Sequence, residues 1–406
     1  MSGFGCLSLL ELHNVPIHRR QNTIDNYIDS FCSAVHTAAR SVTQCRPHHP
    51  DPKPYWCNEL NKLRDRKKFW WKLWLDNGKP KQGQIFVCHK YIKKVFRKSC
   101  RKYASSCNSN NLQKLTTYLK SKNSTAFWKQ FNMRNKVNTE HVHTPSNAEF
   151  VRFYSQVMGR DDCGLTNNQL NVIERVNGWM AEADTQDCNY HFPDHVISKA
   201  ILDLNLGKSP GIDGILSEHL YHGMSEELLT HISRLFHHMV TFCTVPKVFS
   251  VGILVPILKK PTLDPLVPAS YRPLTMCSTM AKLFEAITVP SPDLCNTQFG
   301  FRSGMGTDLA CGVISNSIAI AKEKATPLFV ASLDAEKCFD RIWHAGLFFK
   351  LYNHLPLPLW RFAKTWYDNL SICIKTEGTI GASFRVYRGI RQGSKHSPIY
   401  FSIFYK

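Results

Sequence analysis

The chain has 406 residues, of which 43% are hydrophobic and 12% aromatic, and its formal net charge is +20. This length gives room for two or three domains with cores of their own, and the apolar content excludes an intrinsically disordered chain. The large excess of Lys and Arg predicts a polyanionic partner, most simply a nucleic acid.

Nothing in the sequence points to a membrane or to secretion. The first twenty residues hold only a short apolar patch, and no stretch reaches the roughly eighteen apolar residues that a membrane helix needs. The fifteen cysteines are scattered and form no Cys-x-x-Cys pair, which favours reduced thiols. We therefore expect an intracellular protein, in the nucleus or the cytoplasm, without a membrane partner.

Residues 1–54 are predicted to be a weakly helical N-terminal segment that ends in a linker, because prolines punctuate residues 48–54. The next region, 55–140, is basic and rich in aromatic residues. Between Lys62 and Lys102 there are fifteen Lys or Arg residues and only two acids. Apolar residues at helical spacing predict two helices, possibly antiparallel, joined by a turn at 77–80, with the aromatic side chains in their core.

The basic face of these helices is predicted to bind nucleic-acid phosphates, because helix surfaces usually mix charges of both signs. The alternative is a solvated basic surface without a ligand. The candidate residues for nucleic-acid binding are Lys67, Lys68, Lys93, Lys94, Arg97, Lys98, Arg101 and Lys102.

Residues 141–194 are predicted to be a connecting segment with little chemistry of its own. His191 and His195 are spaced as metal ligands on a helix could be, but Pro193 lies between them and no His-Glu-x-x-His pattern is present. We expect an ordinary surface pair.

A helix at 197–206 precedes the sequence Gly207-Lys208-Ser209. A phosphate-binding P-loop would need glycine at position 202, which is Leu202, so this motif is excluded. A helix at 226–240 and a strand at 251–260 follow. The strand ends in Lys259 and Lys260, and Arg272 comes after the next turn; cations so placed could grip a triphosphate, or belong to an ordinary basic hairpin.

Further along, a helix is predicted at 308–322, and the apolar run 328–333 is predicted to be a buried strand that ends at Asp334 and is followed by helix. A lone aspartate at such a position is most often a helix cap, yet burying it is costly unless it is paired or holds a metal. A strand is predicted at 384–387. Beyond it, Gly393 would let a ligand approach the backbone closely, and Gln392 offers a donor and an acceptor beside it.

The order of these segments resembles the reverse transcriptases of non-LTR (LINE-type) retrotransposons. The resemblance covers residue 195 to the end and predicts a reverse transcriptase domain at 195–406. It rests on Lys-Ser-Pro-Gly-Ile-Asp-Gly at 208–214, Tyr-Arg-Pro-Leu at 271–274, Gln-Phe-Gly-Phe-Arg at 298–302, Ser-Leu-Asp through Phe-Asp at 332–340 and Arg-Gln-Gly-Ser at 391–394. The implied fold is α+β, the fingers and partial palm of a right-hand polymerase, preceded by a basic, mainly helical region.

The resemblance also implies roles for single residues in copying RNA into DNA. Asp334 matches the first metal-binding carboxylate of the palm, with the backbone carbonyl of Ala335 beside it, and Mg²⁺ is the implied cofactor. Phe339 matches the aromatic residue that excludes the sugar 2′-hydroxyl. Arg272 and Lys259 match the triphosphate grip, and Gln392 and Gly393 the motif beneath nucleotide and template. The implied partners are an RNA template, a DNA primer or target and deoxynucleotides, with no small-molecule cofactor.

The sequence also departs from the family pattern. The family needs a Tyr-x-Asp-Asp hairpin after the Arg-Gln-Gly motif, but the 406 residues contain none; Asp161-Asp162 lies upstream of every motif. One carboxylate cannot hold two metal ions, a thumb and an endonuclease are missing, and Lys395 would be awkward if buried. We therefore expect a C-terminally truncated, degraded or prematurely stopped element copy, inactive by itself. The alternative is a non-catalytic RNA- or DNA-binding remnant.

Overall fold

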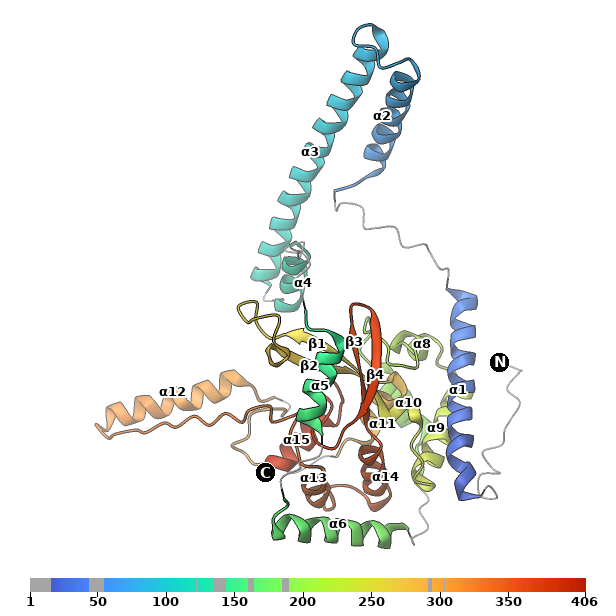
Figure 1. Cartoon of the computed structure of the whole chain (residues 1–406). Coiled ribbons are helices and arrows are strands. Elements are labelled where there is room, and N and C mark those ends of the chain that lie inside the picture. Colours follow the sequence, from blue (N-terminus) through green and yellow to red (C-terminus); the bar gives the residue numbers. More distant parts are fainter. Residues whose placement is uncertain are drawn as a thin grey trace. The chain divides into compact units, whose positions relative to one another are not determined.

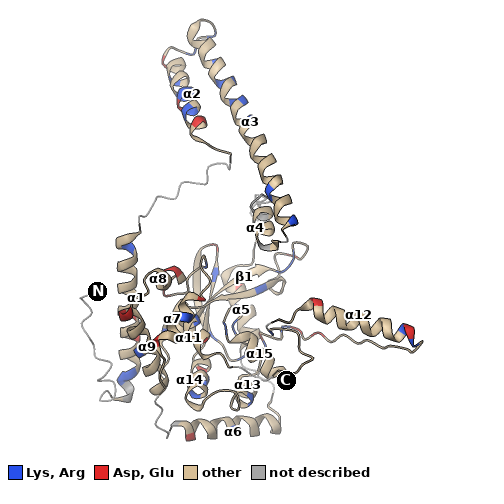
Figure 2. Ribbon diagram, turned by 180° about the vertical axis from the view of Figure 1, so that it is seen from behind, with Lys and Arg blue, Asp and Glu red and all other residues tan. Residues whose placement is uncertain are grey.

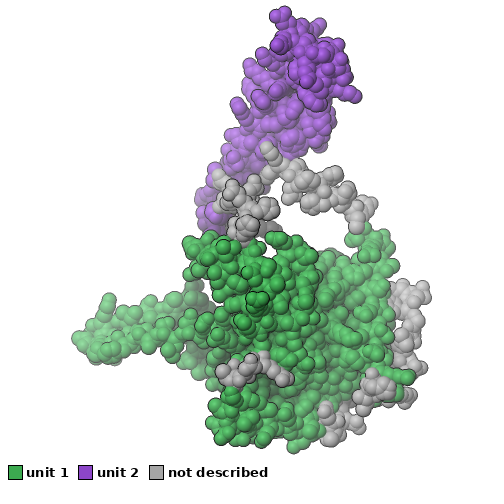
Figure 3. Space-filling model, in the orientation of Figure 1, with its two compact units in different colours: residues 1–43, 143–406 green, residues 44–142 purple. Residues whose placement is uncertain are grey.

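The computed structural model describes residues 16–43, 55–121, 123–134, 144–159, 164–184, 190–290, 294–302 and 304–406. The chain forms two compact units, of which unit 1 comprises residues 1–43 and 143–406 and unit 2 residues 44–142 (Figure 3). Helices and a four-stranded sheet confirm the predicted α+β class. The predicted linker at 48–54 and the pair Asp161-Asp162 lie outside the described residues.

Unit 2 is helical and contains the predicted basic region. Helices α2 (Asn58–Asp76) and α3 (Gln84–Lys120) form an antiparallel hairpin, which confirms the two predicted helices, and α4 (Ser124–Arg134) follows (Figure 1). Leu60 and Ile92 are buried in this unit, and the rings of Trp74 and His89 stack with their centroids 5.0 Å apart. The expectation that the aromatic residues form the core is wrong for several of them, because a helix in a two-helix hairpin has a single covered face; the exposed ones include Phe69, Trp71 and Tyr91.

The N-terminal part of unit 1 contributes three helices that pack on the rest of that unit. In α1 (Ile17–Val42), Tyr27 hydrogen-bonds His231 of α9 (Glu226–Thr241), with 2.7 Å between Oη and Nδ1. Helix α5 (Asn147–Met158) begins with a capping box between Ser146 and Glu149. In α6 (Asn167–Asp184), Trp179 stacks on Tyr352 with ring centroids 4.0 Å apart. The predicted connecting segment therefore supplies parts of the core.

The sheet of unit 1 has the strand order β2-β1-β3-β4. Strand β1 (Val251–Leu258) starts where predicted and ends two residues earlier. It pairs antiparallel with β2 (Tyr271–Met276) and parallel with β3 (Ser371–Thr376). Strand β4 (Thr379–Arg385) pairs antiparallel with β3 and starts earlier than the predicted strand at 384–387. Helix α5 contacts β3 and β4, and also the turn η2 (Pro268–Ser270) just before β2, so it lies across the sheet from one edge to the other.

The remaining helices of unit 1 enclose an aromatic core in which Phe249, Phe284 and Trp366 contact one another. The predicted helix at 226–240 is confirmed as α9, whereas the one predicted at 197–206 ends at Leu202, where a tight turn from Ile201 to Leu204 stops it. That helix is α7 (Asp194–Leu202). The others are α8 (Ser217–His222), α10 (Lys247–Ser250), η2 (Pro268–Ser270), α11 (Thr279–Thr288), α13 (His344–Leu351), α14 (Leu357–Asp368) and α15 (Ser397–Tyr405).

The segment leading to Asp334 differs most from expectation. The predicted helix at 308–322 is confirmed as α12 (Thr307–Glu323), but it buries none of its residues. The predicted buried strand at 328–333 is wrong: Phe329 is 91% and Leu333 98% exposed, and no described strand pairs with this segment. An extended segment becomes a strand only when another chain segment satisfies its backbone groups. The helix predicted after Asp334 begins only at His344, since residues 336–341 form turns.

Candidate functional site

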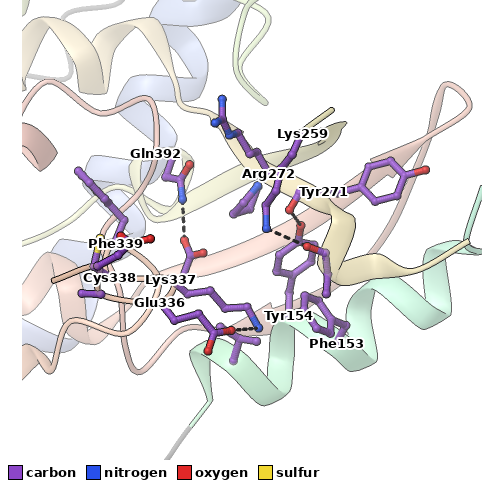
Figure 4. A pocket seen from close by; sticks show the side chains of 16 residues that line it. Phe153, Tyr154, Lys259, Tyr271, Arg272, Glu336, Lys337, Cys338, Phe339 and Gln392 are labelled. Carbon is purple, nitrogen blue, oxygen red and sulfur yellow. Dashed lines mark hydrogen bonds and ion pairs between the residues drawn. The ribbon is translucent and has the colours of Figure 1, made fainter. Parts of the chain in front are cut away.

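A pocket of about 470 Å³ lies in unit 1 where three parts of the chain meet (Figure 4). Its walls come from α5, from the β1–β2 hairpin and from residues 334–340, with Gln392 closing one side. Asp334, the predicted metal ligand, lines it together with five of the six residues predicted for nucleotide binding, namely Lys259, Arg272, Ala335, Phe339 and Gln392. The structure thus brings together residues that are far apart in the sequence.

The β1–β2 hairpin carries Lys259 and Arg272, two of the three cations that line the pocket; the third is Lys337. The register of the hairpin pairs Ile257 with Arg272, and the backbone N–H of Lys259 donates to the carbonyl of Ser270 at 2.9 Å. The Lys259 ammonium is anchored by a 2.8 Å hydrogen bond to the carbonyl of Ala269. Lys260 is also exposed but does not line the pocket, so the hairpin presents one of the two adjacent lysines to it.

The opposite wall is the turn that follows Asp334. Asp334 and Ala335 are exposed, and Glu336 pairs with Lys337 at 3.5 Å. Phe339 stacks face to face on Phe401 of α15, with the ring centroids 4.3 Å apart, which fixes the ring at the edge of the pocket.

Gln392 and Gly393 belong to a loop pressed against β2. The carbonyl of Gln392 accepts a 2.8 Å hydrogen bond from the N–H of Thr275. Gly393 has φ +127°, and a Cβ there would lie 2.5 Å from the carbonyl oxygen of Thr275, so only glycine allows this approach. Gly393 lies outside the main pocket and lines an adjoining hollow of about 220 Å³, which it shares with Phe339 and Gln392.

A buried carboxylate holds this loop from beneath. Glu285 of α11 is 1% exposed and forms an ion pair with Arg391, which is 5% exposed, at 3.1 Å. Glu285 also accepts hydrogen bonds from the Ser394 hydroxyl and from the N–H of Lys395, both at 2.7 Å. The side chain of Lys395 itself is exposed, so the conflict expected for a buried lysine there does not arise.

Sequence reasoning missed two contributions to the pocket. The first is α5, from which Phe153 and Tyr154 line the wall and the Lys337 ammonium lies 4.9 Å from the Phe153 ring centroid. The capping box at Ser146, followed by aromatic residues at helical spacing, was the available signal for this helix. The second is Asp340, which is buried and accepts a hydrogen bond from Gln392. It stood beside Phe339 in the quoted motif without a role.

Comparison with known proteins agrees with this geometry. Residues 257–406 match the family described as "Reverse transcriptase (RNA-dependent DNA polymerase)". The chain carries a reverse transcriptase domain. Asp334 and the six residues predicted for nucleotide binding lie within the matched range, whereas Phe153 and Tyr154 precede it.

Curated relatives of this domain are named as RNA-directed DNA polymerases or Pol polyproteins of transposons and other mobile elements. The chain is 27% identical over 219 residues to "Probable RNA-directed DNA polymerase from transposon X-element" of Drosophila melanogaster, covering 51% of this chain and 24% of the relative. It is 26% identical over 216 residues to "RNA-directed DNA polymerase from mobile element jockey" of Drosophila funebris, covering 51% and 23%. A third relative, "Retrovirus-related Pol polyprotein from type-1 retrotransposable element R2" of Nasonia vitripennis, is 29% identical over 177 residues, covering 42% and 17%. The alignments thus span about a quarter of these relatives' length or less.

The carboxylates around the pocket offer limited room for metal. Within the described ranges, no group of three or more His, Cys, Asp or Glu residues is placed to hold a metal ion, and His191 and His195 are exposed. Of the three acids that line the pocket, Glu336 faces Lys337 and Asp340 faces Gln392. Of these three acids, Asp334 is exposed and is the one that could hold a metal ion. Across the described part of the chain, no helix is both long and apolar enough to cross a membrane.

Proposed function

We propose that the 406 residues form the fingers and part of the palm of an RNA-directed DNA polymerase, and that the 470 Å³ pocket receives a deoxynucleoside triphosphate. The observation that carries this proposal is the arrangement of opposite charges around one cavity. Lys259 and Arg272 line it from the hairpin and Asp334 from the facing turn. The partners of the proposed enzyme are an RNA template and a DNA primer or target.

In this proposal the triphosphate binds to the hairpin. The guanidinium of Arg272 can hold phosphate oxygens in a bidentate manner, and Lys259 adds a point charge beside it. Phe339, held by its stacking on Phe401, contacts the sugar and excludes a 2′-hydroxyl. Gln392 and Gly393 lie beneath the nucleotide and its template base.

Magnesium fits this site as a partner of the nucleotide. Mg²⁺ is commonly held by one or two carboxylates together with substrate phosphates. Asp334, with the backbone carbonyl of Ala335, would supply the protein ligands, and the ion would neutralise charge on the phosphates. Two ions need further carboxylates, and the 406 residues contain no Tyr-x-Asp-Asp sequence. We therefore expect nucleotide binding but no primer extension by these residues alone; template-dependent extension that Asp334→Ala abolishes would contradict this expectation.

The adjacent lysines of the hairpin give a matched test of the pocket. We expect Lys259→Ala to weaken the binding of Mg²⁺-deoxyadenosine triphosphate by about tenfold, because a charge-assisted hydrogen bond to phosphate is worth about 1.5–3 kcal/mol. Lys260→Ala removes the same charge one residue away and is expected to change the affinity less than about twofold. Affinity is measured by titrating a fluorescent deoxynucleotide analogue into the purified chain. Equal losses in the two variants would show that only net charge matters and would refute the proposed pocket.

A second function, nucleic-acid binding by unit 2, is favoured by the charge of α3. This helix of 37 residues contains no Asp or Glu, so its lysines and arginines have no acidic partner on the same helix (Figure 2). Lys90, Lys94, Arg97 and Arg101 follow one another at spacings of four, three and four residues and are all exposed. They form one stripe about 16 Å long. Cations three and four residues apart on a helix repel one another, which a polyanion would relieve.

Exposed Tyr91, about 100° around the helix from Lys90, adds an aromatic face beside this stripe, and bases stack on such side chains in single-strand binding proteins. The candidate residues predicted on α3 lie within the same half of the helix, namely Lys93, Lys94, Arg97, Lys98, Arg101 and Lys102. We therefore propose that α3 binds the phosphate backbone of RNA or DNA, in the polymerase or in a non-catalytic remnant.

The salt dependence of binding tests this surface. Lys94→Gln/Arg97→Gln is expected to reduce the slope of log K against log salt concentration by about 1.4–1.8, since two phosphate contacts are lost. Lys114→Gln/Lys120→Gln changes the same charge on the same helix outside the stripe and is expected to leave the slope nearly unchanged. The measurement is fluorescence anisotropy of a labelled RNA at several salt concentrations. Identical slopes in both double variants and the unchanged chain would count against the proposal.

A further inference from the structure

The side chain of Gln392 is oriented by a buried acid. Its Nε2 donates a 2.8 Å hydrogen bond to Oδ1 of Asp340, which is 6% exposed (Figure 4). An ionised carboxylate can only accept hydrogen bonds, so ionised Asp340 selects the NH₂ group of the amide. The other end of the amide, the oxygen Oε1, is thereby turned away from Asp340 and left to accept from another partner.

The backbones that carry these two side chains are fixed to each other. The N–H of Ile390 donates to the carbonyl of Phe339, and the N–H of Gly389 to that of Ile342, both at 2.8 Å. Gly389 has φ +86°, and a Cβ there would lie 2.6 Å from the carbonyl oxygen of Asp340. Together with the contacts of Glu285 beneath the loop, these bonds set the positions of both main chains. What they leave open is the rotation of the Gln392 amide, and Asp340 sets it.

The burial of Asp340 is unfavourable for its ionised form. Burial raises the pKa of Asp340, while the hydrogen bond from Gln392 and the charges of Lys259 and Lys337 act in the opposite direction. A net rise means that the environment disfavours the ionised form more than its partners favour it. A side chain that is unfavourable for folding yet contacts a pocket residue is expected where function requires it.

We propose that Asp340 is a positioning residue, which holds the Gln392 amide so that its oxygen accepts a hydrogen bond from a nucleotide in the pocket. This inference rests on the proposed function, because the ligand is the same deoxynucleoside triphosphate. It adds a residue that acts through Gln392 rather than on the nucleotide itself. Asparagine at position 340 would have nearly the same volume, but its own amide could pair with either end of the Gln392 amide. Asp340→Asn would therefore keep the packing and lose the preference for one orientation of Gln392.

A double-mutant cycle tests the proposal, with the fluorescent Mg²⁺-deoxynucleotide as the probe. We expect Asp340→Asn to weaken binding about fivefold to tenfold, the equivalent of one hydrogen bond, and Gln392→Ala to do the same. In the Gln392→Ala background, Asp340→Asn is expected to cost nothing more. The melting temperature of Asp340→Asn is expected to equal or exceed that of the unchanged chain, which a purely structural acid would not show.

The role of Asp340 would be overturned if the affinity losses of the two single variants multiplied in the double variant. It would also be overturned if Asp340→Asn lowered the melting temperature together with the affinity. In either case, binding by the unchanged chain that falls with Lys259→Ala would leave the proposed function standing. If the unchanged chain binds no nucleotide, the proposed function fails and the positioning role fails with it. The three outcomes are therefore distinguishable in one set of titrations.

Discussion

Replacing Glu285 by alanine is expected to lower the free energy of unfolding by about 3–5 kcal/mol, the cost of breaking a buried ion pair from one side. Glu285 and Arg391 are both almost fully buried, so the remaining guanidinium would be left without its counter-charge in an apolar environment. The hydroxyl of Ser394 and the N–H of Lys395 would lose their acceptor in the same step. Urea denaturation followed by the fluorescence of the buried Trp360 and Trp366 measures the change.

Two variants separate this effect from a general loss of charge. Asp368→Ala breaks the partly exposed pair between Lys364 and Asp368, which is 2.6 Å long, and is expected to cost less than about 1 kcal/mol. Glu285→Met/Arg391→Met removes both buried charges and is expected to be less destabilised than the sum of its single changes. If Glu285→Ala costs no more than Asp368→Ala, the loop that carries Gln392 is not held by this carboxylate.

The parts of the site that could be predicted from the sequence are those formed by residues close to one another along the chain. Lys259 and Arg272 were predictable because strand, turn and strand follow one another, and the hairpin register places them on one pocket. Asp340 and Gln392 are separated by 52 positions, and the sequence around either residue does not predict the hydrogen bond between them. Tyr154 of α5 reaches the carbonyl of Tyr271 across 117 positions. Packing at such separations is set by the whole fold.

At the apolar run before Asp334, the sequence predicted a strand that is not part of the described sheet. The composition of the run is that of a buried strand, and the prediction followed from composition alone. A strand also needs a neighbour that supplies hydrogen bonds, and the described sheet has β2 and β4 at its edges, neither of them beside residues 328–333. The hydrophobic pattern of a segment shows that it can adopt an extended conformation. Whether it pairs into a sheet depends on the segments around it.

Acid is expected to destabilise unit 1 through His344, by about 3 kcal/mol when the loss is complete. His344 is buried, and its Nε2 donates to the carbonyl of Gly389 at 2.8 Å, because a carbonyl can only accept. Burial lowers the pKa of this imidazole from 6.5 to about 4. The unfolded chain therefore binds a proton before the folded chain does. The stabilisation is complete above about pH 6.5 and is lost as the pH falls from there to about 4.

The buried His396 also has its pKa lowered by burial, so it contributes to the pH dependence with the same sign. His344→Gln keeps an N–H donor near the position of Nε2 without a group that titrates in this range. We expect this variant to show a smaller fall in unfolding free energy between pH 6.5 and 4.5 than the unchanged chain, measured by urea denaturation at each pH. His195→Gln, at an exposed position, is expected to leave the profile unchanged. Parallel pH profiles for His344→Gln and the unchanged chain would contradict this prediction. They would show that the fold does not hold the imidazole neutral. They would also show that its hydrogen bond to Gly389, near the backbone bonds that fix Asp340 and Gln392, does not depend on its protonation.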